Sequence, residues 1–200
     1  MREPTQERGR QRVAKILVAA AKLVAKHGVE AVTTTALARA AKVPVGSIYQ
    51  YFEDAADVLR LLQRQLGEEI VAVCNAALKA APKDIGWRRA TRLSFDTYWE
   101  ELLKRPVYVA LLRDATRTQS FSDTMSTGDS DIGDLFRAGL VAGGVTLEGP
   151  RAHAIIETVL GSLSALTDLA MLSDDPKDRD ARRREMLRMI ELYLSDVIEG

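Results

Sequence analysis

The stretch from Thr33 to Phe52, TTTALARAAKVPVGSIYQYF, constrains the fold of this 200-residue chain more than any other segment. It predicts a short helix over about 35–41, capped by a threonine hydroxyl, with a small inward face formed by Leu37, Ala40 and Ala41. Pro44 ends this helix, because proline cannot continue a helix and disfavours helical geometry in the residue before it. A second helix follows over about 45–52. Two short helices joined by a tight turn match the helix-turn-helix pattern.

The second of these helices has an outward face that packing does not explain. At 100° per residue, Ile48 and Phe52 share one face, which must point into a core. The opposite side and its flanks carry small, hydroxyl and amide groups in place of the usual charges: Gly46, Ser47, Tyr49, Gln50 and Tyr51. Such groups suit hydrogen bonds to phosphates and base edges, and a glutamine can pair with the N6 and N7 edge of adenine. We therefore interpret this helix as one that reads DNA.

The charge distribution supports a nucleic-acid partner for the N-terminal part only. The whole chain has a formal net charge of zero, but residues 1–52 hold nine Lys or Arg against three Asp or Glu. The remainder is acidic by the same margin. A basic head on an acidic body indicates that only the head meets a polyanion. A solvated, charged helix surface is the alternative that charge alone leaves open.

The rest of the chain predicts further helices. Residues 1–9 are interpreted as a mobile arm that carries Arg2 and Arg8. Apolar spacing and breakers then predict helices over about 10–27, 54–80, 85–104, 106–118, 132–142, 151–172 and 178–198. Asp54 is the expected cap of the helix over 54–80, and Asp84 that of the helix over 85–104. The polar segment 119–131 is expected to be a loop or a mobile lid.

About half of the aromatic residues lie between Trp87 and Phe121. An ordinary core is the favoured interpretation. The functional alternative is an apolar effector pocket with a few polar groups, formed by Phe95, Tyr98, Trp99, Leu102, Tyr108, Leu112, Arg113 and Phe121.

The two last helices are expected to form a dimer interface. The helix 151–172 is apolar around most of its circumference, so it needs more than one partner surface. Two such helices from each of two chains would build a four-helix interface. The predicted interface residues are Ile156, Leu160, Leu163, Leu166, Ile190, Leu194 and Val197.

Several classes of protein are disfavoured. The only cysteine, Cys74, is expected to be a buried structural thiol, and His27 a residue at a helix end. We find no phosphate-binding glycine loop, no metal-ligand spacing and no Ser-His-Asp set, so we expect no catalytic residue, no metal and no cofactor. The start of the chain lacks the apolar core of a signal peptide, and we expect a cytoplasmic protein without a membrane segment. A helical protein-interaction module is the main rival to DNA binding.

The residues of the N-terminal part resemble the TetR family of bacterial transcriptional regulators. The resemblance covers about residues 10–60 and rests on Ile16, Ala20, Gly28, Thr33-Thr34, Leu37-Ala38, Ala41, Val43, Gly46, Ile48-Tyr49, Tyr51-Phe52 and Leu59. It implies an all-α protein with a three-helix DNA-binding head and a larger helical domain for ligand binding and dimerisation. The expected division is 1–53 for the arm and head and 54–200 for the helical domain. The function implied is a repressor that binds a near-palindromic operator on double-stranded DNA as a homodimer and is released by a small, largely apolar effector.

By matched position, the resemblance implies phosphate contacts for Thr34 and Thr35. It also implies that Val45, Gly46, Ser47, Tyr49, Gln50 and Tyr51 line the DNA. Two positions depart from the family pattern. Lys42 stands where a turn glycine is usual, at a cost on the order of 1 kcal/mol, and it could face a phosphate. Ala55 stands where a backbone-contacting lysine is usual, which predicts a lower salt dependence of DNA binding.

Overall fold

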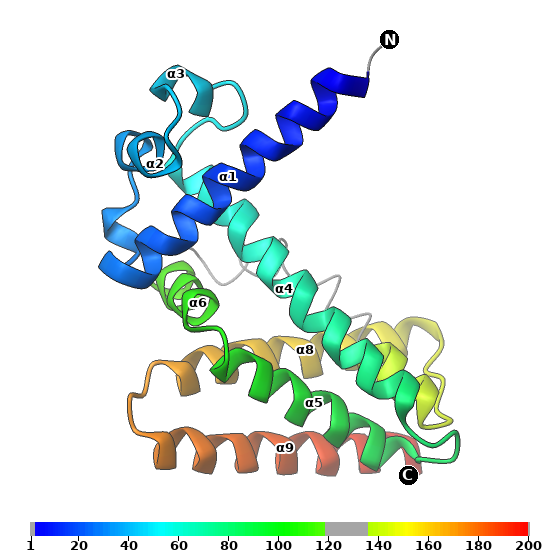
Figure 1. Ribbon diagram of the computed structural model, residues 1–200. Helices are drawn as coiled ribbons and strands as arrows, with labels where there is room; N and C mark the ends of the chain where they lie inside the picture. The colour runs from blue at the N-terminus through cyan, green and yellow to red at the C-terminus, as the bar shows by residue number, and fades with distance from the viewer. Residues whose placement is uncertain (1–2, 119–135, 200) are drawn as a thin grey trace. The chain divides into compact units, whose positions relative to one another are not determined.

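The computed structural model describes residues 3–118 and 136–199, and the regular secondary structure in these ranges is helical. Figure 1 shows the elements in chain order, which are α1 (Glu3–His27), the 3-10 turn η1 (Val29–Ala31), α2 (Thr34–Ala41), α3 (Val45–Ile48), α4 (Ala55–Ala80), α5 (Trp87–Leu103), α6 (Pro106–Thr118), α8 (Gly149–Met171) and α9 (Pro176–Glu199). Residues 136–142 are also helical. The predicted all-α fold is confirmed.

The chain forms two compact units. The N-terminal unit comprises Met1–Gly67 and Arg105–Asp114, and the C-terminal unit comprises Glu68–Lys104 and Ala115–Gly200. Both α4 and α6 therefore contribute residues to each unit. The long helix predicted over 54–80 is confirmed, and Asp54 caps it as expected, because its Oδ1 accepts a hydrogen bond from the Asp57 N–H at 2.8 Å.

The core of the N-terminal unit holds the turn motif in place. Its fully buried members include Ile16 of α1, Leu37 of α2, Ile48 of α3 and Val58 of α4. Phe52 is also buried in this cluster, so the inward face predicted for the second helix of the motif is correct. The apolar side chains of four helices thus fix the orientation of α2 and α3.

Two predictions of helix ends were wrong. The segment expected to be a mobile arm is helical from Glu3 onward, so α1 begins seven residues earlier than predicted. Pro4 does not prevent this, because proline is tolerated in the first turn of a helix. Helix α5 begins at Trp87 with Gly86 as its N-cap, and Asp84 is not the cap. The expected loop 119–131 lies outside the described residues.

The core of the C-terminal unit joins α5, residues 136–142, α8 and α9 around Trp87, Phe136, Leu140, Ile155, Ile156, Val159, Leu160, Ile190 and Leu194. Gly143 follows the helical segment and lies directly against the start of α5. A Cβ atom at Gly143 would be 2.2 Å from Trp87 Cα. Only glycine therefore permits this close approach.

One helix of the C-terminal unit is long and apolar enough to cross a membrane. The segment Arg151–Met171 meets this criterion by length and hydropathy alone, although we expected no such segment. Its side chains Ile155, Ile156, Val159 and Leu160 are buried in the core of the same chain. Core helices pass the same test, and core packing accounts for this part of its apolar surface.

Candidate nucleic-acid interface and effector site

The turn between α2 and α3 is held by local hydrogen bonds. Thr33 is the N-cap of α2, and its Oγ1 accepts a hydrogen bond from the Ala36 N–H at 3.1 Å. Lys42 follows the helix in the left-handed conformation, with φ 55° and ψ 47°. The Val43 N–H then donates to the Ala38 carbonyl at 3.0 Å, a bond that closes the helix end. The threonine cap and the left-handed position of Lys42 were both expected from the sequence.

Helix α3 is shorter than predicted. It runs only from Val45 to Ile48, and Tyr49 is its C-cap. The chain continues as a hydrogen-bonded turn in which the Tyr51 and Phe52 N–H groups both donate to the Ile48 carbonyl at 3.0 Å. The prediction of a helix to residue 52 was therefore wrong, although the turn keeps Phe52 in the core.

The outward face of α3 and the following turn consists of five exposed residues, Val45, Gly46, Tyr49, Gln50 and Tyr51. The exposed fraction is 58% for Tyr49, whereas Ser47 is only 8% exposed. The outward orientation predicted for Ser47 was wrong. Since neighbouring positions of a helix are only 100° apart, the packed side that buries Ile48 also covers Ser47. The exposed face is thus uncharged, as expected, but lacks the serine.

Two contacts connect this face to other elements. The hydroxyls of Thr34, at the start of α2, and Tyr49 lie 3.3 Å apart, within hydrogen-bond distance. On α1, a Cβ atom at Gly9 would lie 3.7 Å from Tyr51 Oη, so the tyrosine ring lies against this turn of α1. Thr35 is exposed beside Thr34. Sequence reasoning missed the contact with Gly9 because it treated that segment as an arm, although the tolerance of helices for Pro4 could have indicated the extension.

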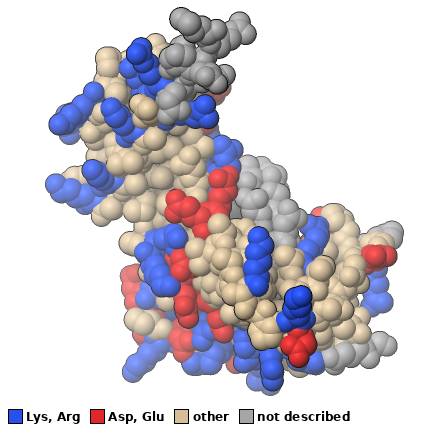
Figure 2. Space-filling model, turned by 45° about the vertical axis from the view of Figure 1, so that its right-hand side comes forward, with Lys and Arg blue, Asp and Glu red and all other residues tan. Residues whose placement is uncertain are grey.

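The N-terminal unit carries exposed positive charge on α1 and α2. The exposed basic residues are Arg8, Arg10, Arg12, Lys15, Lys22, Lys26, Arg39 and Lys42. Figure 2 shows mostly Lys and Arg among the charged side chains of this unit on the face drawn. Ala55 is half-buried against the core and supplies no charge. Further along α4, Arg60 and Arg64 are exposed as well, and Arg60 pairs with Asp57.

The predicted effector residues do not fall in one unit. Phe95, Tyr98, Trp99 and Leu102 belong to α5 in the C-terminal unit, whereas Tyr108, Leu112 and Arg113 belong to α6 in the N-terminal unit. Phe121 lies outside the described residues. On α5, the Phe95 and Trp99 rings are stacked with centroids 6.1 Å apart and are both buried. These residues have the packing of a core, which was the favoured interpretation.

The predicted dimer residues are mostly turned inward within their own chain. Ile156, Leu160, Ile190 and Leu194 are at most 6% exposed and belong to the C-terminal core. Leu163 and Val197 are half-buried against the same cluster, and Leu166 is half-buried as well. The first four residues thus have little surface left for a second chain. Different apolar residues of α8, its C-cap and α9 are exposed, namely Leu169, Leu172, Met189, Leu192 and Tyr193.

The last two sequence predictions concern the cysteine and possible metal ligands. Cys74 is fully buried, as predicted, and its Sγ lies 3.9 Å from the Ser94 carbonyl oxygen, to which it donates. Among the described residues, no group of three or more His, Cys, Asp or Glu side chains could hold a metal ion.

Comparison with known proteins gives a match in the N-terminal unit. Residues 16–61 match the family model described as bacterial regulatory proteins, tetR family. This range includes α2, α3 and the left-handed Lys42 between them. No protein with a curated description matches the chain.

Several solved structures share the fold over almost the whole chain. A TetR-family transcriptional regulator from Streptomyces coelicolor is similar with a TM-score of 0.63 and 22% identity, covering 95% of this chain and 99% of the other. A TetR transcriptional regulator from Rhodococcus sp. RHA1 gives a TM-score of 0.67 and 18% identity, over 94% and 97% of the two chains. RolR in complex with resorcinol gives a TM-score of 0.65 and 20% identity, covering 92% of this chain and 89% of the other. The likeness extends beyond the head to the helices of the C-terminal unit.

Proposed function

We propose, from the premise that residues 16–61 form a TetR-family helix-turn-helix domain within a TetR-type fold, that this chain is a ligand-responsive transcriptional repressor. In this proposal, residues 1–53 bind DNA and residues 54–200 bind the effector and a second chain. The protein would act in the cytoplasm without catalysis, and its partners would be double-stranded DNA, a small, largely apolar effector and a second copy of itself.

The exposed, uncharged face of α3 carries the DNA-binding proposal. A glycine at position 46 permits close approach of the backbone to DNA, and Gln50 can pair with an adenine edge in the major groove. Thr34, Thr35 and Lys42 lie on neighbouring elements and would contact phosphates. The exposed Lys and Arg of α1 and α2 add the sequence-independent attraction that nucleic-acid binding requires.

Exposed apolar side chains on α8 and α9 support the homodimer. Leu192 is 64% exposed and Leu169 49% exposed, and Leu172, Met189 and Tyr193 are exposed as well. Large apolar residues on two neighbouring helices are costly to leave in water, and a second copy would cover them in a four-helix arrangement. A two-fold dimer would present two heads to half-sites whose centres are about 34–36 Å apart or somewhat more, which requires a near-palindromic operator.

The effector would act through a change in the spacing of the two heads. Helix α4, like α6, has residues in both units, and we assign to this long helix the transmission of a change in the C-terminal unit to a head. The effector must bind the two conformations with different affinity, since equal affinity shifts no population. RolR has been solved with resorcinol, and by analogy with that complex the effector here would be small and largely apolar.

Selection of bound sequences from a random pool of double-stranded DNA tests the DNA-binding function. We expect a near-palindromic consensus for the full-length chain. Gln50→Ala should relax the base preference at the position that Gln50 contacts, while weak nonspecific binding remains, because phosphate contacts are unchanged. A pool without any enriched sequence would favour the rival function, a helical protein-interaction module. An unchanged consensus for Gln50→Ala would remove Gln50 from base readout.

Sedimentation of two leucine variants tests the dimer. Leu192→Glu should yield a folded monomer, because the side chain is exposed within one chain. Leu160→Glu is the matched comparison, and it should unfold the C-terminal unit because Leu160 is 6% exposed and belongs to the core. A dimer that persists in Leu192→Glu would mean that the interface lies elsewhere.

A further inference from the structure

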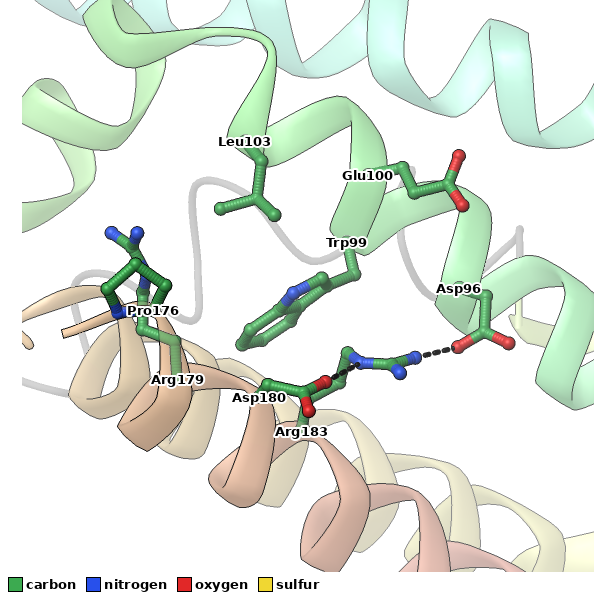
Figure 3. A pocket seen from close by; sticks show the side chains of 8 residues that line it. All are labelled: Asp96, Trp99, Glu100, Leu103, Pro176, Arg179, Asp180 and Arg183. Atoms are coloured by element: carbon green, nitrogen blue, oxygen red, sulfur yellow. Dashed lines mark hydrogen bonds and ion pairs between the residues drawn. The ribbon is translucent and has the colours of Figure 1, made fainter.

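The C-terminal unit contains a cavity that the proposed function does not use. It has a volume of about 360 Å³ and lies between α5 and the first turns of α9. Its lining residues are Asp96, Trp99, Glu100 and Leu103 of α5, with Pro176, Arg179, Asp180 and Arg183 of α9, as Figure 3 shows. Only Trp99 belongs to the predicted effector residues. This volume is in the range of small-molecule sites, about 300–1,000 Å³.

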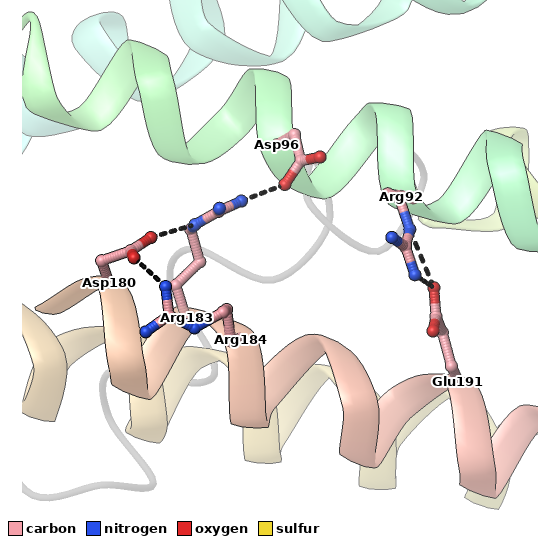
Figure 4. A network of polar contacts seen from close by, with 6 residues as sticks. All are labelled: Arg92, Asp96, Asp180, Arg183, Arg184 and Glu191. Atoms are coloured by element: carbon pink, nitrogen blue, oxygen red, sulfur yellow. Dashed lines mark hydrogen bonds and ion pairs between the residues drawn. The ribbon is translucent and has the colours of Figure 1, made fainter.

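One wall of the cavity is held by ion pairs. Arg183 donates through Nη1 to Asp96 and through Nε to Asp180 Oδ1, the second bond at 3.3 Å. Arg184 donates to the other oxygen of Asp180 (Figure 4). Further along the same two helices, Arg92 Nη2 of α5 donates to Glu191 of α9 at 2.6 Å. Both cavity aspartates therefore already accept hydrogen bonds from arginine, and this wall has little charge left for a ligand.

The opposite wall combines an indole with aliphatic groups. Trp99 is only 5% exposed although it lines the cavity, and Phe95 stacks against it, so its orientation is fixed by the core. Leu103 is 50% exposed and Pro176 is exposed as well. In Figure 3 these three residues surround one side of the cavity. A rigid aromatic and aliphatic surface of this kind suits a planar apolar group.

Arg179 gives this wall its available charge. Among the described residues, its guanidinium makes one long hydrogen bond, from Nη1 to the Ser173 carbonyl at 3.5 Å, and no carboxylate lies within ion-pair distance. The neighbouring Arg182, Arg183 and Arg184 all form ion pairs. A guanidinium has five N–H donors in a fork that matches a carboxylate. Arg179 thus retains the capacity to bind an anionic group.

Glu100 is the competing anchor, and it would favour a cation instead. Figure 3 shows Glu100 and Arg179 on opposite sides of the Trp99 indole. The Glu100 side chain is 69% exposed, and its nearest described partner, Lys104 Nζ, is 4.0 Å away. Arg179 is half-buried. Because solvent and salt weaken the interactions of an exposed charge more than those of a half-buried one, Arg179 is the stronger anchor.

We propose that this cavity binds a small planar carboxylate, with its aromatic ring against Trp99, Leu103 and Pro176 and its carboxylate on the Arg179 guanidinium. The inference needs no DNA binding, and the cavity shares only Trp99 with the predicted effector residues. It therefore stands or falls separately from the proposed repressor function.

Titration of the full-length chain with 2-naphthoate tests this site, followed by calorimetry and by Trp fluorescence. The variant Trp87→Phe leaves Trp99 as the only tryptophan, so its signal reports on the cavity. We expect saturable binding, with 2-naphthamide bound at least tenfold more weakly because it lacks the charge-assisted hydrogen bonds. Arg179→Gln should lower the affinity for 2-naphthoate about tenfold or more and leave that for the amide unchanged.

Arg188→Gln is the matched control, because Arg188 is an exposed arginine of α9 that does not line the cavity. It should bind 2-naphthoate like the parent chain. Circular dichroism melts should be alike for the parent and Arg179→Gln, since the substitution breaks no ion pair among the described residues. Absence of saturable binding, equal affinity for acid and amide, or equal effects of the two arginine variants would each overturn the proposal. Preferential binding of 2-naphthylmethylamine would overturn it in favour of a cation site at Glu100.

Discussion

Replacing Lys42 separates the backbone and charge contributions of the turn to stability and DNA binding. Lys42 is the one non-glycine residue with positive φ among the described residues, at φ 55° and ψ 47°. This conformation costs an L-residue roughly 1–2 kcal/mol relative to the right-handed one. Glycine removes that cost, but it gains conformational freedom in the unfolded chain worth about 0.4–1 kcal/mol. Lys42→Gly should therefore stabilise the folded chain by about 0.5–1 kcal/mol.

Lys42→Ala distinguishes the two contributions. Alanine keeps the Cβ atom that makes the left-handed conformation costly, so its stability should stay within about 0.5 kcal/mol of the parent. Both variants remove the same positive charge. If Lys42 contacts a phosphate in each half-site, both should weaken operator binding equally and lower the salt slope by about one unit per half-site. The two variants should thus differ in stability and agree in DNA binding.

Urea unfolding of the full-length chain measures the first quantity, and operator titrations at several salt concentrations measure the second. Lys42→Asn serves as a further control, because asparagine tolerates the left-handed region and is uncharged. It should fall between glycine and alanine in stability. The backbone argument would be refuted if Lys42→Gly were no more stable than Lys42→Ala. The phosphate argument would be refuted by an unchanged salt slope in all three variants.

Three other substitutions test other parts of the molecule. Ala55→Lys should tighten operator binding and steepen its salt dependence, while lowering stability by about 0.3–1 kcal/mol because a cation opposes the dipole at the start of α4. Gly143→Ala should destabilise the C-terminal unit by at least about 1–3 kcal/mol in urea unfolding, because the new Cβ would meet the Trp87 backbone. Asp178→Asn should lower stability at pH 7, and this effect should shrink as the pH falls below 3.8. Hydrogen bonds from Arg182 and Ser173 hold the pKa of Asp178 below its ordinary value of 3.8, so its contribution is present above that value and disappears as the carboxylate protonates.

Each of these has an outcome that would contradict it. A flat salt response of Ala55→Lys would mean that position 55 is away from DNA. Gly46→Ala is the control for Gly143→Ala, because a Cβ at Gly46 meets nothing within 4 Å. If both glycine variants had the same stability, the close approach at Gly143 would be wrong. If the difference between Asp178→Asn and the parent chain did not decrease at any pH below 3.8 at which both remain folded, its effect would come from packing and not from charge.

Much of the turn motif could be predicted from the sequence because it depends on neighbouring residues. The cap at Thr33 bonds three residues ahead, and Pro44 prevents the helix from continuing. The left-handed position of Lys42 was implied by the resemblance, in which a turn glycine is usual at this position. The end of α3 was not predictable in the same way. Its periodicity continues to Phe52, but the regular helix ends at Ile48 and the chain continues as a hydrogen-bonded turn.

Interactions between distant segments were beyond sequence reasoning. Arg183 pairs with Asp96, which is 87 residues away along the chain. Both residues line the cavity between α5 and α9, of whose lining residues only Trp99 had been singled out. No local pattern encodes which carboxylate an arginine of another helix will meet.

The sequence by itself determined that the chain is helical, where its turn motif lies and which charges surround it, because capping, helix breaking and periodicity act within one or two helical turns. The tertiary structure decided what covers each apolar face. Ile156, Leu160, Ile190 and Leu194 have the spacing of an interface, but they fill the core of their own chain. Leu192 and Leu169 remain exposed instead. Periodicity reveals that a helix has an apolar side, but only the packed positions of all the helices determine whether that side meets its own chain or another.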